Sequence, residues 1–116
     1  EELSAIKDLI ATYQASAYKS LGIVCKTESQ ACEMADKLQI PDIHFLSNQS
    51  SAFVQGIVIT SAHMAKGLEF DEVIIPQADD RNYHSEIDRS MLYVAITRAM
   101  HRLTLTYSGT KHTPFI

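Results

Sequence analysis

A chain of 116 residues is long enough for one compact domain and too short for two of typical size. Apolar residues make up 46% of it and charged residues 21%, which excludes a disordered chain, and no apolar run approaches the roughly 18 residues that would span a bilayer. The net charge of −4 excludes a basic surface over the whole domain, so any contact with nucleic acid has to come from a local site.

The first part of the chain predicts a helix, a strand and a second helix. Over residues 2–18 apolar side chains recur at steps of three and four, which is typical of one face of an amphipathic helix: Leu3, Ile6, Ile10, Tyr13 and Ala17. The apolar run 20–25 predicts a strand. Thr27, with Gln30 three residues later, fits a capping box that opens a helix. That helix would end at Pro41 and bury four residues, Ala31, Met34, Ala35 and Leu38.

The rest of the chain alternates in the same way. Residues 43–46, 56–60 and 72–76 predict strands, and the polar residues 47–51 predict a loop. The polar segment 77–84 is expected to be exposed, and the box at 85–88 opens a helix with five residues on its buried side, Met91, Leu92, Ala95, Ile96 and Ala99. A period of two at Leu103, Leu105 and Tyr107 predicts the last strand. Strands alternating with helices predict an α/β fold with a mainly parallel sheet covered by helices.

Cysteine and histidine usage indicates a cytoplasmic protein without a metal centre. Cys25 and Cys32 are seven residues apart, which is not zinc-ligand spacing, and we expect both thiols to be reduced. The five histidines do not cluster along the sequence. We therefore predict no metal site built from protein ligands.

One stretch combines buried strands with a polar turn. The apolar run 56–60 leads into a turn that holds His63, Lys66, Gly67 and Glu69, and a second apolar run follows at 72–76. In an α/β sheet the strands fix the backbone while the loop at their ends meets the ligand. This arrangement makes the turn the first candidate for a binding site.

The spelling of two segments resembles a known family. Residues 63–70 read His-Met-Ala-Lys-Gly-Leu-Glu-Phe, and residues 92–99 read Leu-Tyr-Val-Ala-Ile-Thr-Arg-Ala. They resemble motifs V (about 56–70) and VI (about 88–100) of superfamily-one DNA helicases of the UvrD/Rep type, with a spelling nearest to the helicase IV and HelD-like branch. Residues 24–30, within the segment 20–31, resemble motif IV of the same family.

The resemblance implies that residues 1–116 are one RecA-like domain, with a three-layer fold, from a larger bacterial helicase. In this family ATP lies between this second domain and a first RecA-like domain of the same polypeptide. The chain has no Gly-x-x-x-x-Gly-Lys-Ser/Thr phosphate loop and no strand ending in an Asp-Glu pair, so ATP and Mg²⁺ would be held mainly by that first domain. This domain alone is then expected to be inactive. The nine residues 47–55 are too few for the subdomain that UvrD and Rep insert before motif V.

The resemblance also assigns roles to residues. It implies that Arg98 is an arginine finger on the γ-phosphate, because a guanidinium stabilises the charge that develops during phosphoryl transfer. Glu69 would accept a hydrogen bond from the ribose, and Gly67 would let the backbone approach the nucleotide. Lys26 stands where the family places a motif IV arginine near the same phosphate, although lysine lacks the planar fork.

A second set of residues would face single-stranded DNA. The resemblance places Ser61 and His63 there, since a hydroxyl and an imidazole bind phosphate oxygens without reading sequence. Two further positions stay open between ligand contact and a local structural role, namely Lys66 and Thr97.

The sequence leaves two other functions open. HelD-like proteins resemble these helicases but act as ATP-driven factors on RNA polymerase without unwinding duplex. A binding module without a catalytic partner domain is the other alternative, and the presence of both Arg98 and Glu69 argues against it. No membrane partner is expected.

Overall fold

The computed structural model describes residues 2–39, 56–65, 68–78, 82–83 and 85–107, and the backbone of 43–45. The helices and strands, in chain order, are α1 Glu2–Gln14, β1 Ser20–Cys25, α2 Glu28–Leu38, β2 Ile43–Phe45, β3 Gly56–Ser61, β4 Phe70–Ile75, α3 Glu86–Ile96 and β5 Ala99–Leu105. All described strand pairs are parallel, in the order β2-β3-β1-β4-β5. The predicted α/β fold with a parallel sheet is therefore confirmed.

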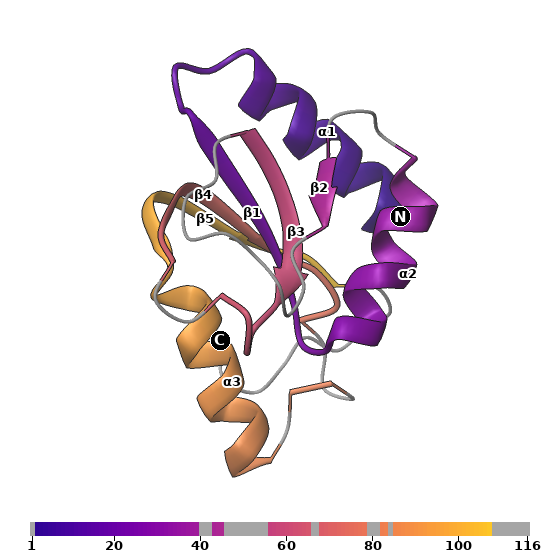
Figure 1. The fold of residues 1–116 in the computed structure, drawn as a ribbon, viewed down its shortest axis with the longest axis vertical. Helices are drawn as coiled ribbons and strands as arrows, with labels where there is room; N and C mark the ends of the chain where they lie inside the picture. The colour runs from indigo at the N-terminus through magenta and orange to yellow at the C-terminus, as the bar shows by residue number, and fades with distance from the viewer. Residues whose placement is uncertain are drawn as a thin grey trace.

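Two apolar cores hold three layers together. The first core packs α1 and α2 against one face of the sheet, and the second packs α3 against the other face (Figure 1). The α1 residues predicted at core positions are buried at Ile6, Ile10 and Tyr13, while α3 buries Leu92 and Ala95. Since the strands are parallel, their carboxyl ends share one edge of the sheet and their amino ends the other. We call these the carboxyl edge and the amino edge.

The first helix is shorter than its apolar pattern predicts. It ends at Gln14 rather than near residue 18, and Ala17 lies outside it, exposed to solvent. The Ser16 hydroxyl donates to the Tyr13 carbonyl at 2.6 Å and accepts from the Tyr18 N–H at 3.2 Å. These local bonds offer the backbone an alternative to the next helical turn, which is why the helix stops here.

The second helix begins as predicted but forms only half of its capping box. The Thr27 side chain accepts from the Gln30 N–H at 3.2 Å, whereas the Gln30 amide group reaches away to Asn82 Oδ1 at 2.8 Å. The helix ends at Leu38 because Gln39 adopts a left-handed conformation, with φ 49°, and bonds back to the Ala35 carbonyl. Pro41 and the loop at 47–55 lie outside the described residues.

Two predictions for the second half need correction. Within the segment 77–84, predicted to be exposed, Tyr83 is 1% exposed and Ala78 is fully buried. Ala78 is held there by a backbone bond to Thr106 at 2.8 Å. The last strand begins at Ala99, four residues before the alternating pattern, because β5 pairs with β4 from Phe70 onward through a bulge.

Candidate functional site

Residues 62–69 join the two edges of the sheet, and we call them the crossing segment. It starts at the carboxyl edge, where the Ala62 N–H donates to the Cys25 carbonyl at 2.8 Å, and ends where Phe70 begins β4 at the amino edge. A turn forms at its start, since the Ala65 N–H donates to the Ser61 carbonyl at 3.0 Å. Two predicted site residues in this segment, Lys66 and Gly67, lie outside the described residues.

Ser61 and His63 differ sharply in exposure. The Ser61 side chain is 4% exposed, and its hydroxyl accepts from the Met64 N–H at 3.3 Å, so it shapes the turn. A hydroxyl this buried has little exposed surface of its own, and the expected contact of Ser61 with DNA stays a prediction. His63, by contrast, is exposed. The turn that Ser61 stabilises therefore presents His63 to solvent at the carboxyl edge.

Arg98 joins the two sequence motifs at the amino edge. Its Nε donates to the Val94 carbonyl at 3.1 Å, and its Nη1 donates to the Leu68 carbonyl of the crossing segment at 3.4 Å. Its Nη2 donates to the Thr97 hydroxyl at 3.1 Å, and that hydroxyl in turn donates to the Val94 carbonyl at 3.0 Å. The hydroxyl of Thr97 thus helps to position the guanidinium.

The charge of Arg98 is not neutralised within the part of the chain that the structure describes. Its three side-chain acceptors there are carbonyl and hydroxyl oxygens, and no described carboxylate lies within 4.0 Å of it. The side chain is partly exposed. A guanidinium held in place by neutral acceptors keeps its full charge for an anion that approaches from outside.

Glu69 lies between two residues bonded to Arg98. The preceding carbonyl, of Leu68, accepts from the Arg98 side chain, and the following N–H, of Phe70, donates to the Arg98 carbonyl at 2.9 Å. The Glu69 side chain is exposed. The structure thus brings Glu69 and Arg98 to the same edge, as the motif resemblance implied.

Lys26 lies at the opposite edge from Arg98. It follows β1 at the carboxyl edge, where its Nζ is 2.7 Å from Asp88 Oδ1 and 6.0 Å from the centroid of the Tyr83 ring. Asp88 and Arg98 are ten positions apart along α3 and its end, which at 1.5 Å per residue is about 15 Å. Lys26 and Arg98 thus lie near opposite ends of α3, and the expected contact of Lys26 with the γ-phosphate stays a prediction.

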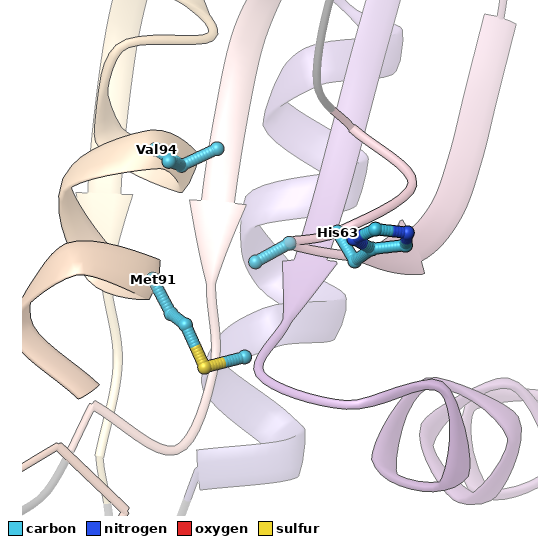
Figure 2. Close-up of a pocket in the computed structure, with 4 residues that line it drawn as sticks. His63, Met91 and Val94 are labelled. Atoms are coloured by element: carbon cyan, nitrogen blue, oxygen red, sulfur yellow. The ribbon is translucent and has the colours of Figure 1, made fainter. Parts of the chain in front are cut away.

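A pocket of about 120 Å³ opens between the crossing segment and α3. Its lining consists of Ala62 and His63 from the segment and of Met91 and Val94 from the helix. Figure 2 shows Met91 and Val94 projecting from α3 on the side that faces the turn carrying His63. The combination of an imidazole with apolar walls suits a flat, partly apolar ligand group.

A separate polar cluster lies near the start of β4 and β5. Glu72 is fully buried, its Oε1 is 3.7 Å from Arg102 Nε, and neither carboxylate oxygen has a hydrogen-bond partner among the described residues. Burial raises the pKa of Glu72, and Arg102 opposes that rise. Tyr18 lies 4.9 Å from Arg102 and stacks on His101 with centroids 5.5 Å apart. The sequence alone gave no sign of this cluster, since its members come from three separated segments.

Among the described residues, no three histidine, cysteine, aspartate or glutamate side chains gather closely enough to hold an ion. The described helices include none that is long and apolar enough to cross a membrane. The two cysteines are free, with Cys25 buried and Cys32 exposed. The charged group of this site is the Arg98 guanidinium, whose chemistry suits a phosphate.

A profile of the UvrD-like helicase C-terminal domain matches residues 2–110, almost the whole chain. The chain belongs to this family. Among solved structures, the C-terminal domain of a possible DNA helicase from Lactobacillus plantarum WCFS1 superposes with a TM-score of 0.85 at 27% identity, covering 98% of this chain and 70% of that one. This match confirms the RecA-like fold of the UvrD-like domain.

Two characterised relatives share parts of the sequence. DNA helicase II of Escherichia coli K12 is 33% identical over 73 residues, which cover 54% of this chain and 10% of the helicase. The Gabija protein GajB of Bacillus cereus VD045 is 43% identical over 58 residues, which cover 50% of this chain and 12% of GajB. The UvrD-like domain thus spans about a tenth of the length of either relative.

Proposed function

We propose that this UvrD-like domain is the C-terminal motor half of an ATP-dependent DNA helicase or translocase. In this proposal the amino edge closes on ATP bound by a first RecA-like domain, and the carboxyl edge holds part of a single DNA strand. The observation that carries the proposal is the placement of Arg98, whose charged guanidinium is anchored to both motifs and paired with no described carboxylate.

At the amino edge, Arg98 would stabilise the negative charge that develops on the γ-phosphate as water attacks it. Its bonds to Val94 and Leu68 hold the guanidinium before the nucleotide arrives, which reduces the reorganisation needed in the transition state. Glu69 would accept a hydrogen bond from the ribose, with Gly67 beside it. The first domain would hold the triphosphate of ATP and its Mg²⁺, because this chain has no phosphate loop.

At the carboxyl edge, exposed His63 would donate to a phosphate oxygen of the strand, and the pocket beside it would receive a sugar or a base edge. Lys26 belongs to this edge, so we assign it to the strand rather than to the nucleotide. Such backbone contacts position a strand without reading its sequence. Because the chain carries a net charge of −4, strand binding would rest on this local set and would weaken as salt rises.

The test is ATP hydrolysis by the full polypeptide that contains this domain, with and without an oligo-dT single strand. Arg98→Ala is expected to lower kcat about a hundredfold or more while nucleotide binding is largely kept. The kcat of Arg98→Lys should lie between those of the wild type and Arg98→Ala, since lysine keeps the positive charge but lacks the planar, two-pronged guanidinium. Arg89→Ala is the matched control, because Arg89 is an exposed arginine of the same helix, 3.9 Å from exposed Glu86.

Three results would separate the possibilities. Retention of ATPase activity in Arg98→Ala would exclude the arginine-finger role. A wild-type ATPase that ignores single strands and does not unwind duplex, but that co-purifies with RNA polymerase, would favour the HelD-like alternative. Loss of activity in Arg98→Ala with strand stimulation intact in Arg89→Ala would support the motor-half assignment.

A further inference from the structure

We infer that Thr97 is the positioning residue of the proposed arginine finger. Its hydroxyl holds the Arg98 guanidinium in one orientation, which leaves one N–H on each of the two terminal nitrogens for the terminal phosphate of ATP. This inference rests on the proposed function, because it takes Arg98 as the group that stabilises the γ-phosphate. It assigns Thr97 a role through Arg98 and no contact of its own with the nucleotide.

The Thr97 hydroxyl has a single hydrogen, and that hydrogen is already used within α3. Thr97 Oγ1 donates to the Val94 carbonyl at 3.0 Å, three residues earlier in the chain. A hydroxyl that has donated its hydrogen can bind a further polar group only as an acceptor. The same oxygen accepts from Arg98 Nη2 at 3.1 Å. The bond to Val94 therefore makes the hydroxyl an acceptor for the guanidinium.

The Val94 carbonyl completes a closed set of three hydrogen bonds. Its oxygen accepts from Thr97 Oγ1 and also from Arg98 Nε at 3.1 Å. Nε and Nη2 belong to the same planar guanidinium, so two acceptors that are bonded to each other hold it at two points. One acceptor alone would let the plane turn about that bond, whereas two acceptors set its orientation.

The remaining donors lie on the terminal nitrogens of Arg98. A guanidinium carries one N–H on Nε and two on each terminal nitrogen. The acceptors on Val94, Leu68 and Thr97 take one N–H each. One N–H on Nη1 and one on Nη2 thus have no acceptor among the described residues. Two N–H groups on a planar, partly exposed guanidinium suit two oxygens of one phosphate.

Removal of the Thr97 hydroxyl would release one of the two points that orient the guanidinium. Nε would still bond to Val94, but Nη2 would lose its acceptor and the side chain would sample more orientations. Stabilisation of the transition state depends on donors that are oriented before the charge develops. Thr97 is exposed and caps the C-terminal end of α3 through its backbone N–H, so its side chain fills no core space. The loss should therefore slow the chemical step more than it affects folding or nucleotide binding.

The test measures ATP hydrolysis by the full polypeptide, with oligo-dT present, for Thr97→Val, Thr97→Ala and Thr97→Ser. In the valine and alanine variants we expect kcat to fall about fivefold to tenfold with KM for ATP nearly unchanged, because one hydrogen bond to the guanidinium is lost. The serine variant keeps the hydroxyl and should keep most of the wild-type kcat. Thr12→Val is the matched control, because Thr12 is an exposed helical threonine whose hydroxyl donates to the Asp8 carbonyl at 3.0 Å.

The double variant Thr97→Val/Arg98→Ala separates positioning from other roles. Without a guanidinium the hydroxyl has nothing to orient, so the kcat of the double variant should equal that of Arg98→Ala. A further fall in the double variant would overturn the positioning role, as would a Thr97→Ser variant as slow as Thr97→Val. An Arg98→Ala variant with wild-type turnover would refute the proposed function itself, whereas an impaired Arg98→Ala with a normal Thr97→Val would refute only this inference.

Discussion

Gly22, in the central strand β1, is the position where the fold most directly constrains the site. A Cβ added there would lie 2.5 Å from Phe70 Cδ2 and 2.7 Å from Cε2, far inside van der Waals contact. Phe70 is 2% exposed, and its N–H donates to the Arg98 carbonyl at 2.9 Å. The ring packed over Gly22 is thus the side chain of the residue that aligns the start of β4 with Arg98.

The expected effect of Gly22→Ala can be set from two opposing terms. Alanine would favour the strand backbone by roughly 0.5–1 kcal/mol, because glycine loses more entropy on folding. Displacing a close-packed, buried ring costs roughly 1–3 kcal/mol, and here the overlap is about 1 Å. The clash prevails, so we expect a net loss of about 1–2 kcal/mol and a fall in Tm of about 4–10 °C.

Thermal and urea unfolding of the 116-residue chain would measure the change in Tm and in unfolding free energy. The double variant Gly22→Ala/Phe70→Leu would show whether the clash with the ring causes that change. Leucine removes the ring atoms that meet the new methyl group, so Phe70→Leu should cost less in the Gly22→Ala background than in the wild type. Ser29→Ala, at an exposed position in α2, is the control. An unchanged Tm in Gly22→Ala, or additive losses in the double variant, would refute this packing argument.

Three further predictions concern buried and capping groups. Burial raises the folded-state pKa of Glu72 above 4.5, so the carboxyl favours folding when protonated, and this contribution is lost as the pH rises through that pKa. Between pH 5 and pH 7 the unfolding free energy of the wild type should therefore decrease more than that of Glu72→Gln, which has no carboxyl at this position. Chemical denaturation at both pH values would measure the two decreases. Burial raises the pKa of Cys25 to about 12, so a thiol reagent should label Cys32 in the native chain and Cys25 only after unfolding. Labelling of both at equal rates would contradict this. Ser85→Ala removes the N-cap of α3 and should cost about 1 kcal/mol, whereas Ser85→Asp should retain most of the stability in the same denaturation assay.

The local features of the fold could be predicted from the sequence because short-range chemistry determines them. The Ser85 box forms in full, since both of its bonds lie within four residues. The Thr27 box forms only in part, because Gln30 finds Asn82, which is 52 positions away in the chain. Tyr83 is likewise buried by contacts with residues far away in the chain, although its sequence neighbours are polar. Such contacts depend on how the layers pack together, so a local sequence pattern does not predict them.

The candidate site was predictable where its residues belong to contiguous motifs. Glu69 and Arg98 come together at one edge because each directly precedes a strand of the parallel sheet: motif V ends where β4 begins, and motif VI ends where β5 begins. Lys26 was expected near the nucleotide because it stands where the family places a motif IV arginine, whereas in the structure it follows β1 at the carboxyl edge. A residue that follows a strand lies at the carboxyl edge, whereas a residue that follows the returning helix lies at the amino edge. This rule of parallel sheets separates Lys26 from Arg98 without any side-chain detail.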